Sequence, residues 1–364
     1  MAVALLLAGA VPATAMDLEI VNESGLPSEQ VFVTLDTGPG DTPVFPAQLP
    51  QNTPVALSTL PSSIPIQETF PAGILLIGYG AGVAQNAPNP ASSNDPNTST
   101  TRYGFVEFTA PGVADNTYID QFGVPTRVDT FDAAGKAVDT RAPVCNADSI
   151  RRQLLEIPGS AEKRGPSGEF LRVVGPSKLG VSPLFPQTYP SLDQYVASLE
   201  GQTLSVTTLF VGGNVATYSG VVQGGAITLS GTMTAPPVGG AQPIEIPLTS
   251  DGIYGANGPY TVGAGPATTL QNDVYGQIYN RVVSGFGLGY WGGRYGNALD
   301  DRPGTPTPGW WGQEAFAAAR TAPAPFPAYS AYAAVIARTA QAYGFPFSDS
   351  LPFNPQAGLP AGGT

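Results

Sequence analysis

The chain has 364 residues and a formal net charge of −12, which disfavours binding to nucleic acid or anionic membranes, because both attract clustered Lys and Arg. It contains no histidine and a single cysteine, Cys145. These counts exclude Ser-His-Asp and Cys-His catalysis, H-E-x-x-H zinc sites and intrachain disulfides. We expect no cofactor and no metal, so carboxylates are the candidate acids and bases.

The first residues have the character of a targeting segment. Residues 1–15, MAVALLLAGAVPATA, combine an apolar run with the small-residue pattern Ala13-Thr14-Ala15, where a signal peptidase could cut. The run is too short to span a bilayer as a helix. The pattern predicts a signal peptide over residues 1–15 and a secreted, extracellular protein.

Residues 16–145 are predicted to form a β-sandwich or barrel domain. The alternating runs DLEIV and QVFVTL, within residues 17–36, predict a pair of strands. The apolar run AGILLIGYG (72–80) predicts a buried strand, and residues 104–125 and 126–135 continue the β pattern. With 45 Gly, 38 Pro and 12% charged residues, the composition is also typical of a loop-rich, mainly β protein.

Residues 146–364 are predicted to form a mixed α/β domain, with the end of the chain returning to the first domain. Helical spacing is found at 149–157, 273–283 and 328–342. Residues 191–201 carry a capping box from Ser191 to Gln194 and a terminal Gly201. The runs TLSVTTLFV and GAITLSGTM predict strands. The expected architecture is two domains that flank a wide cleft.

Two acids stand inside apparent strands of the stretch GFVEFTAPGVADNTYIDQFGVP (104–125). Glu107 shares a strand face with Phe105 and Thr109, and Asp120 shares one with Tyr118. If the two runs form a hairpin that turns around residues 113–114, Glu107 lies opposite or nearly opposite Asp120. Opposed like charges destabilise a sheet, and burial against aromatic rings adds to the cost.

Such a costly pair has a functional and a structural interpretation. The functional one is a protonated acid beside an ionised base, which is the arrangement of glycoside hydrolysis. The structural one is that one acid points to solvent or pairs with Arg102, Arg127 or Arg141. The pattern alone favours the structural interpretation.

The order of several motifs resembles one known family. FVEFT followed by YIDQFGVP is similar to the acid-bearing segment of glycoside hydrolase family 64, the β-1,3-glucanases with a thaumatin-like fold. IYGANGPY (253–260), QIYNRVV (277–283) and YAAVIARTAQAYGFPFSD (332–349) follow in the family's order. The resemblance implies an inverting β-1,3-glucan hydrolase with Glu107 as general acid and Asp120 as general base. It also places Thr109 and Asp349 among the substrate-binding residues.

All three tryptophans fall within residues 291–311, where aromatic rings could stack on sugar. The candidate stacking residues are Tyr290, Trp291, Trp310 and Trp311. The alternative is that these rings fill the junction between the last helices and the sheet. Asp300 and Asp301 could bind sugar hydroxyls, but a solvated turn before Pro303 is the better interpretation.

Two functions of different classes follow from the sequence. The first is a secreted β-1,3-glucanase, and the second is a thaumatin-like glucan-binding protein that has lost the reaction. Retention of Glu107 and Asp120 favours the enzyme. In either case we expect a monomer whose partner is β-1,3-glucan, with no nucleic acid and no membrane as partner.

Overall fold

The computed structural model describes residues 3–8, 15–38, 41–67, 69–84, 99–110, 113–132, 134–179, 189–210, 213–237, 239–256, 258–268, 274–292, 296–300, 302, 329–342 and 344. The chain is mainly β, as the sequence predicts, and has several sheets. None of the sheets in these residues closes into a barrel. Contacts divide the chain into unit 1, formed by Met1–Thr188 and Val335–Gly344, and unit 2, formed by Tyr189–Ala334.

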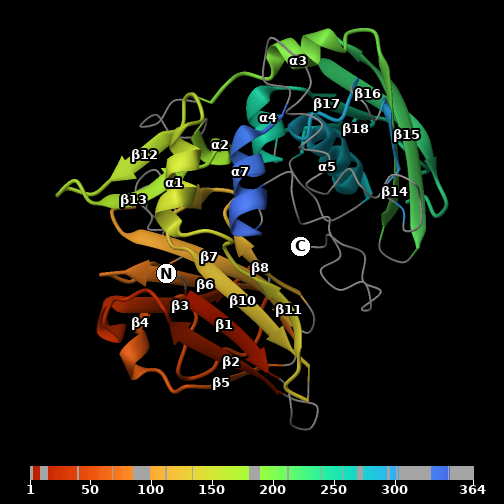
Figure 1. The fold of residues 1–364 in the computed structure, drawn as a ribbon. Helices are drawn as coiled ribbons and strands as arrows, with labels where there is room; N and C mark the ends of the chain where they lie inside the picture. The colour runs from red at the N-terminus through yellow and green to blue at the C-terminus, as the bar shows by residue number, and fades with distance from the viewer. Residues whose placement is uncertain are drawn as a thin grey trace. The chain divides into compact units, whose positions relative to one another are not determined.

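Unit 1 contains two five-stranded sheets (Figure 1). The first has the order β11–β10–β1–β2–β5, with β1 at Val3–Ala8, β2 at Ala15–Asn22, β5 at Ile64–Gln67, β10 at Thr126–Phe131 and β11 at Ala137–Arg141. The second has the order β4–β3–β6–β7–β8, with β3 at Val31–Thr37, β4 at Val55–Ala56, β6 at Phe70–Tyr79, β7 at Arg102–Ala110 and β8 at Val113–Thr117. The strands predicted at 72–80 and along 104–135 are therefore confirmed.

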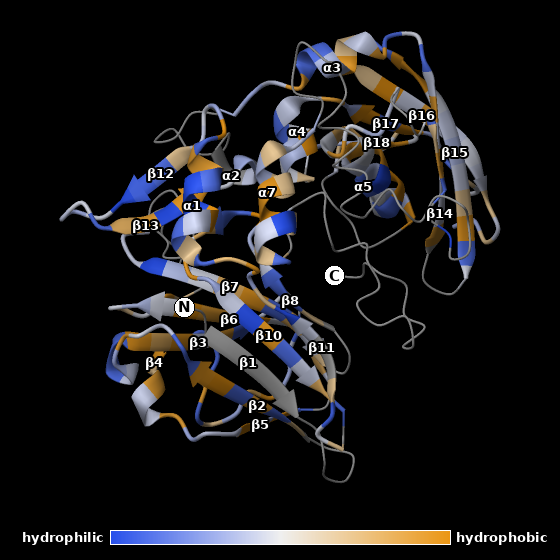
Figure 2. Cartoon of the chain, viewed as in Figure 1, coloured by the Kyte–Doolittle hydropathy of each residue, from blue (hydrophilic) through white to orange (hydrophobic). Residues whose placement is uncertain are grey.

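The two sheets share one apolar core. Leu18 and Val128 from the first sheet cluster with Val33, Leu75 and Val106 from the second, and all five are at most 1% exposed. Apolar residues on β2 and β3 are visible in Figure 2. The predicted pairing of the two runs in 17–36 is wrong, since β2 and β3 belong to different sheets. Strands β2 and β3 each bury an apolar face in the shared core. They do so from two different sheets that face each other, instead of pairing side by side in one sheet.

Further elements complete unit 1. A three-stranded sheet has the order β12–β13–β9, with β9 at Gln121–Phe122, β12 at Ala161–Arg164 and β13 at Phe170–Val174. The helices are α1 at Ala147–Leu155 and the short α2 at Pro176–Leu179, with 3-10 turns η1 at Ser28–Gln30 and η2 at Leu57–Thr59. Helix α1 confirms the helix predicted at 149–157. The sequence places the change of domain at residue 145, whereas unit 1 continues to Thr188.

Unit 2 is built on a six-stranded sheet of order β18–β17–β16–β15–β14–β19. The strands are β14 at Thr203–Phe210, β15 at Asn214–Gln223, β16 at Ala226–Met233, β17 at Ile244–Pro247, β18 at Thr261–Val262 and β19 at Ala298–Asp300. The helices are α3 at Asp193–Ser198, α4 at Ser250–Gly255, α5 at Val274–Gly287 and α7 at Ala331–Ala340, which continues into unit 1 from Val335. These elements confirm the two strands and the helices predicted at 273–283 and 328–342.

The helix predicted at 191–201 is shorter than expected. Helix α3 has six residues, and its N-cap residue Leu192 makes no side-chain capping bond. Ser191 Oγ instead accepts from the Asp193 N–H at 3.0 Å, and Ser250 Oγ accepts from the Leu192 N–H at 2.8 Å. The predicted capping box is therefore wrong, because a serine from the start of α4 supplies part of the cap.

Candidate active site

Glu107 lies on β7, between β6 and β8 in the second sheet of unit 1. Its strand neighbours Val106 and Phe108 point into the shared core and are 1% and 3% exposed. By the alternation of a strand, Glu107 shares the other face with Phe105 and Thr109. Glu107 is half-buried there, so its carboxyl stands at the boundary between packed and solvated surroundings.

The register of β7 and β8 places Asp115, not Asp120, opposite Glu107. The expectation that Glu107 lies opposite or nearly opposite Asp120 is wrong. Strand β7 ends at Ala110 and β8 begins at Val113, so residues 113–114, where the turn was predicted, already belong to β8. A change of register alters which residues meet, and Asp120 follows β8 in the connection to β9.

Glu107, Asp115 and Thr117 form a hydroxyl-bridged group, which we call the acid cluster. Thr117 Oγ1 lies 2.6 Å from Glu107 Oε2 and 2.6 Å from Asp115 Oδ1. Asp115 is 7% exposed. Sequence reasoning missed Asp115, although an acid two residues before Thr117 in the run ADNTYID was a signal that could have found it.

Asp120 is half-buried and is held from the segment that follows β13. Ser177 Oγ lies 2.9 Å from the Ile119 carbonyl oxygen and 3.1 Å from Asp120 Oδ1, so its one hydrogen serves these two acceptors. The Gly175 N–H donates to the Asp120 carbonyl at 2.7 Å. A Cβ atom on Gly175 would stand 2.4 Å from the Ile119 carbonyl oxygen. Glycine at 175 thus permits the close approach that fixes the backbone of Asp120.

The chain between Asp115 and Asp120 is anchored to the first sheet by a polar network. The buried Tyr118 Oη accepts from the Thr126 N–H at 2.7 Å. Thr126 Oγ1 donates to Asn116 Oδ1 at 2.9 Å. Burial raises the pKa of Tyr118 to about 12, so its phenol stays neutral. These contacts tie the end of β8 to the start of β10.

Thr109 stabilises an irregular part of β6. Its Oγ1 accepts from the Ala72 N–H at 3.2 Å, and Ala72 has a positive φ of 43°. The pairing of β6 with β7 shifts register between Phe70 and Gly73. Thr109 therefore shares a strand face with Glu107 and also fixes the backbone beside it.

Two of the arginines that could have paired with these acids have other partners. Arg127 Nε lies 2.8 Å from Asp129 Oδ2. Arg102 Nε donates to the Gly123 carbonyl at 3.0 Å, and burial lowers the pKa of Arg102. In these contacts Arg127 and Arg102 are engaged by groups other than Glu107 and Asp120.

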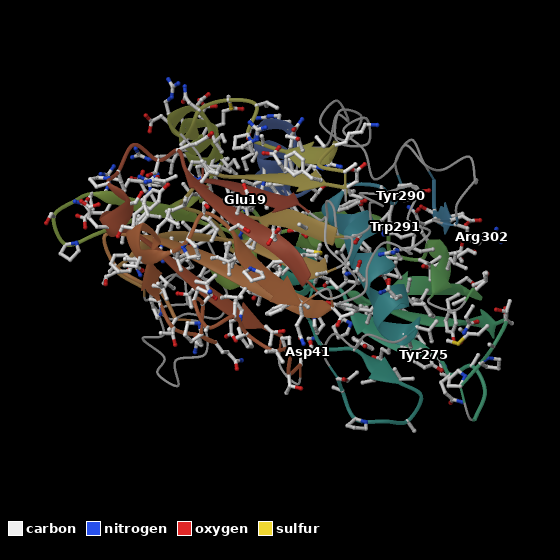
Figure 3. All side chains as sticks on the ribbon, turned by 90° about the horizontal axis from the view of Figure 1, so that it is seen from below. Glu19, Asp41, Tyr275, Tyr290, Trp291 and Arg302 are labelled. Atoms are coloured by element: carbon white, nitrogen blue, oxygen red, sulfur yellow. The ribbon has the colours of Figure 1, made fainter. Side chains whose placement is uncertain are left out.

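The aromatic candidates Tyr290 and Trp291 lie side by side in unit 2 (Figure 3) and are each 1% exposed. Tyr290 Oη donates to the Ala298 carbonyl at 2.5 Å, and Trp291 Nε1 donates to the Val282 carbonyl at 3.0 Å. Their ring faces are closed to solvent, which favours the core-packing alternative. Trp310, Trp311, Asp301 and Asp349 lie outside the described residues.

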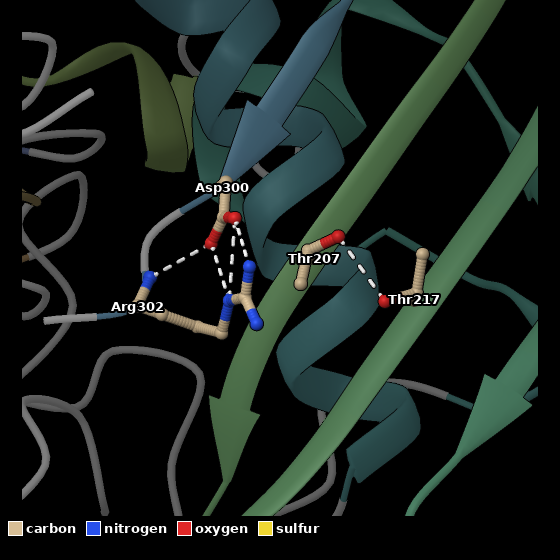
Figure 4. A network of polar contacts seen from close by, with 4 residues as sticks. All are labelled: Thr207, Thr217, Asp300 and Arg302. Carbon is tan, nitrogen blue, oxygen red and sulfur yellow. Dashed lines mark hydrogen bonds and ion pairs between the residues drawn. The ribbon is translucent and has the colours of Figure 1, made fainter. Parts of the chain in front are cut away.

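Asp300 ends β19 and forms an ion pair with Arg302 (Figure 4). Arg302 Nη2 lies 2.6 Å from Asp300 Oδ2, and Arg302 Nε donates to Asp300 Oδ1 at 2.9 Å. The guanidinium lowers the pKa of Asp300. This geometry fits the predicted solvated turn and leaves the Asp300 carboxylate engaged by its own neighbour.

Neither a metal-binding cluster nor a membrane-spanning helix occurs in the residue ranges given above. No group of three or more Asp, Glu or Cys side chains in them is suited to hold a metal ion. No helix in the same part of the chain is long and apolar enough to cross a membrane.

One comparison with known proteins is decisive. A family model described as β-1,3-glucanase matches residues 73–359, which include both Glu107 and Asp120. The chain belongs to glycoside hydrolase family 64. Searches of curated proteins and of solved structures gave no match. The candidate site of this family 64 protein therefore rests on its own geometry.

Proposed function

We propose that this family 64 protein is a secreted glycoside hydrolase that cleaves β-1,3-glucan by inversion, with Glu107 as general acid and Asp120 as general base. One observation carries the proposal: two half-buried carboxylates, Glu107 and Asp120, lie in unit 1, and each has a hydroxyl group within hydrogen-bond distance. Thr117 contacts Glu107, and Ser177 contacts Asp120. Both acids fall within the residues matched by the β-1,3-glucanase family.

In the proposed reaction the two acids have opposite tasks. Glu107 gives its proton to the glycosidic oxygen as the bond from that oxygen to the anomeric carbon breaks. Asp120 takes a proton from a water molecule, and that water attacks the anomeric carbon from the opposite face. The new hydroxyl therefore stands on the other side of the ring, and both acids return to their starting states by exchange with solvent.

The strand register supports Asp120 rather than Asp115 as the base. An inverting pair needs carboxyl groups about 6.5–9.5 Å apart to leave room for the water. Directly opposed strand residues have Cβ atoms only about 4.5–5.5 Å apart, and Asp115 holds that opposed position. Asp120 lies beyond the end of β8, as a splayed pair requires.

We propose further that the glucan lies on the face of β6, β7 and β8 that carries Glu107, in the cleft of a thaumatin-like fold. Thr109 shares this face by strand alternation. Trp310, Trp311 and Asp349 remain proposed substrate-binding residues. Tyr290 and Trp291 would reach sugar only after leaving the interior of unit 2, since each is 1% exposed.

The proposal is tested by reducing-sugar release from laminarin. Glu107→Gln and Asp120→Asn should each lower turnover by about a hundredfold or more, as expected for loss of a general acid or base. Glu29→Gln, at an exposed position in η1, is the matched control and should keep full activity. Wild-type turnover in either acid variant would contradict its assigned role.

Binding to insoluble curdlan separates the enzyme from a glucan-binding protein. The two acid variants should still sediment with curdlan, because the substitutions preserve the size and polarity of the side chains. If the wild-type protein binds curdlan but releases no sugar from any β-1,3-glucan, the chain is a binding protein instead.

A further inference from the structure

The six-stranded sheet of unit 2 has one buried face and one exposed face. On β14 and β15 the residues Leu204, Val206, Tyr218 and Val222 are each 0% exposed. Helix α5 packs against these strands (Figure 1). Side chains alternate along a strand, so the residues between them point away from this core. The composition of the second face is therefore not dictated by packing in unit 2.

Two rows of hydroxyl side chains cross the exposed face. The strand register sets the members of each row beside one another on β14, β15 and β16. We call these residues the hydroxyl face: Thr207, Thr217 and Thr232 in one row, and Ser205, Ser219 and Ser230 in the next. The members on β15 and β16 are exposed, and those on β14 are half-buried. The Oγ1 atoms of Thr207 and Thr217 lie 3.2 Å apart (Figure 4).

Charged side chains stand beside the hydroxyl face and not within it. Glu245 lies on β17, the next strand after β16, where it is paired with Thr228. Asp300 lies on β19, where the register sets it beside Thr207, and it forms an ion pair with Arg302. A partner without charge can therefore cover the face without stripping water from an ionised group, which would be costly.

The outer face of the first sheet in unit 1 has a different composition. By alternation from the core residues Leu18 and Val128, this outer face carries Asp17 and Glu19 on β2 and Arg127 on β10. Both sheets thus present a face to solvent, but only the unit 1 face has charged side chains among its central strands. The uncharged composition is a property of the unit 2 face.

We propose that the hydroxyl face is a second docking surface, separate from the acids of unit 1, and that its ligand is insoluble β-1,3-glucan. The choice of ligand rests on the proposed function, in which this polymer is the substrate. Sugar hydroxyls both donate and accept hydrogen bonds, as Ser and Thr hydroxyls do. A glucan chain can therefore bind at many positions along the two rows. Docking here keeps the protein on the particle between successive cleavages.

The side chains of the hydroxyl face are suited to this kind of docking. They are short, and Thr is stiff at χ1, so ordering them costs little conformational entropy. The Thr methyl groups and the neighbouring Val221, which is 45% exposed, offer apolar contact to the C–H faces of sugar rings. Neighbouring strands of a sheet are rotated by roughly 20–25°. A flexible polymer follows this twist, whereas a flat crystal lattice would meet only part of the face.

The test is equilibrium adsorption to curdlan, measured in the Glu107→Gln background so that hydrolysis does not change the particle. Ser219→Arg places a charge within the hydroxyl face and should weaken adsorption by about tenfold or more, because the arginine must lose water on docking. Ser167→Arg, in the exposed turn between β12 and β13, adds the same charge elsewhere and should adsorb like its parent. Equal adsorption by the two arginine variants would overturn the proposal.

A gentler variant decides the question if Ser219→Arg does not fold. Thr217→Val preserves the shape and the strand propensity and removes one hydroxyl. It should weaken adsorption by about two- to tenfold, the effect of one lost hydrogen bond. Denaturant unfolding establishes that the variant is folded. Adsorption unchanged by Thr217→Val would contradict a role of the hydroxyl rows.

Hydroxyl-radical footprinting locates the contact in the protein without any substitution on the face. Oxidation of Val221 should fall when the protein is adsorbed to curdlan. Val44 in unit 1 is 66% exposed and serves as the internal control, whose oxidation should stay unchanged. Equal oxidation of Val221 with and without curdlan would place the contact elsewhere.

The outcomes separate this inference from the proposed function. A wild-type protein that adsorbs through the hydroxyl face but releases no sugar would refute the proposed function and leave the docking surface intact. Cleavage of laminarin by a protein whose curdlan adsorption ignores Ser219→Arg would refute the docking surface alone. A wild-type dimer that Ser219→Arg dissociates, measured by sedimentation equilibrium, would identify the face as a contact between two copies and would also overturn the proposal.

Discussion

Burial determines whether the aromatic side chains of Tyr290 and Trp291 can bind sugar or serve only to stabilise the fold. Tyr290 and Trp291 have the residue types that stack on sugars, yet both rings pack inside unit 2 and both polar atoms bind main-chain carbonyls. Trp291 also fills the space over Gly285, where an added Cβ would stand 2.4 Å from its Nε1. At the scale of single residues, these two side chains therefore stabilise the fold.

Substitutions at these positions should alter stability without altering recognition of glucan. Trp291→Ala should cost about 3–5 kcal/mol of unfolding free energy, as large-to-small changes in a core do. Tyr290→Phe removes one hydrogen bond and should cost about 1 kcal/mol. Denaturant unfolding measures both, and KM of Tyr290→Phe for laminarin should equal that of the wild type. A large rise in KM at unchanged stability would restore the sugar-stacking role.

The residues of the candidate site were only partly predictable. Glu107 and Asp120 stand out in the sequence because acids are rare within apolar strands. Asp115 did not, because its importance depends on the register with β7, and register is fixed by where the turn begins. A turn centred on residues 113–114 and a turn that ends before Val113 are equally compatible with the strand pattern.

Among the elements, strand register connects the fold to the chemistry. Because Asp115 occupies the place opposite Glu107, the proposed base must come from outside the ladder, and Asp120 follows β8 directly. Helix α5 continues to Gly287, beyond its predicted end at residue 283. Register is set by contacts between strands, and the periodicity within one strand does not reveal it.

The proposed roles of Glu107 and Asp120 predict the stereochemistry of the product. If the two acids act as an inverting pair, the first sugar released from a β-1,3-glucan should be the α-anomer. Proton NMR during the first minutes of hydrolysis, before mutarotation, measures it. An initial β-anomer would indicate a retaining pair, and Asp115 would then become the candidate nucleophile because it lies opposite Glu107.

The polar contacts between the end of β8 and the start of β10 predict how the stability of unit 1 changes at high pH. Tyr118 ionises near pH 10 in the unfolded chain, whereas burial raises its pKa to about 12 in the folded protein. Its contribution to stability is therefore complete below pH 10 and is lost as the pH rises to about 12. Tyr118→Phe should cost about 1 kcal/mol at neutral pH, through loss of the acceptor for the Thr126 N–H.

The same variant should show a shallower loss of stability than the wild type between pH 10 and 12. Denaturant midpoints measured across this range test the prediction. Parallel curves for the two proteins would mean that Tyr118 is ionised equally in the folded and unfolded states.

For the whole molecule, composition and periodicity predicted the fold class well, but they did not predict which strands pair with each other. The abundance of Gly and Pro and the alternating runs predicted a mainly β chain, and the helices α1, α5 and α7 were found from their spacing. The sheet to which each strand belongs was not predictable, because β2 and β3 satisfy the same apolar pattern whether they pair or face each other across a core. Long-range packing made that choice.

The N-terminal segment supplies a strand to the first sheet of unit 1 and is also the predicted signal peptide, and these two roles compete. Residues 3–8 form β1, which is parallel to β10 and antiparallel to β2. Cleavage after Ala15 would remove this strand and leave a gap of about two strand spacings, roughly 9–10 Å, between β2 and β10. A secreted protein cut at this point must therefore draw β2 and β10 together or leave their backbone groups to water.

We expect export with cleavage after Ala15, so that the mature chain begins at Met16, because the small-residue pattern at 13–15 is what a signal peptidase recognises. Intact-mass measurement of the protein recovered from the medium checks this. In the mature chain, backbone amides of β10 should be protected from hydrogen exchange if β2 has moved to pair with it. Recovery of exported protein that still carries residues 1–15 would show instead that β1 is a permanent strand, and a chain started at Met16 should then unfold at a lower denaturant concentration.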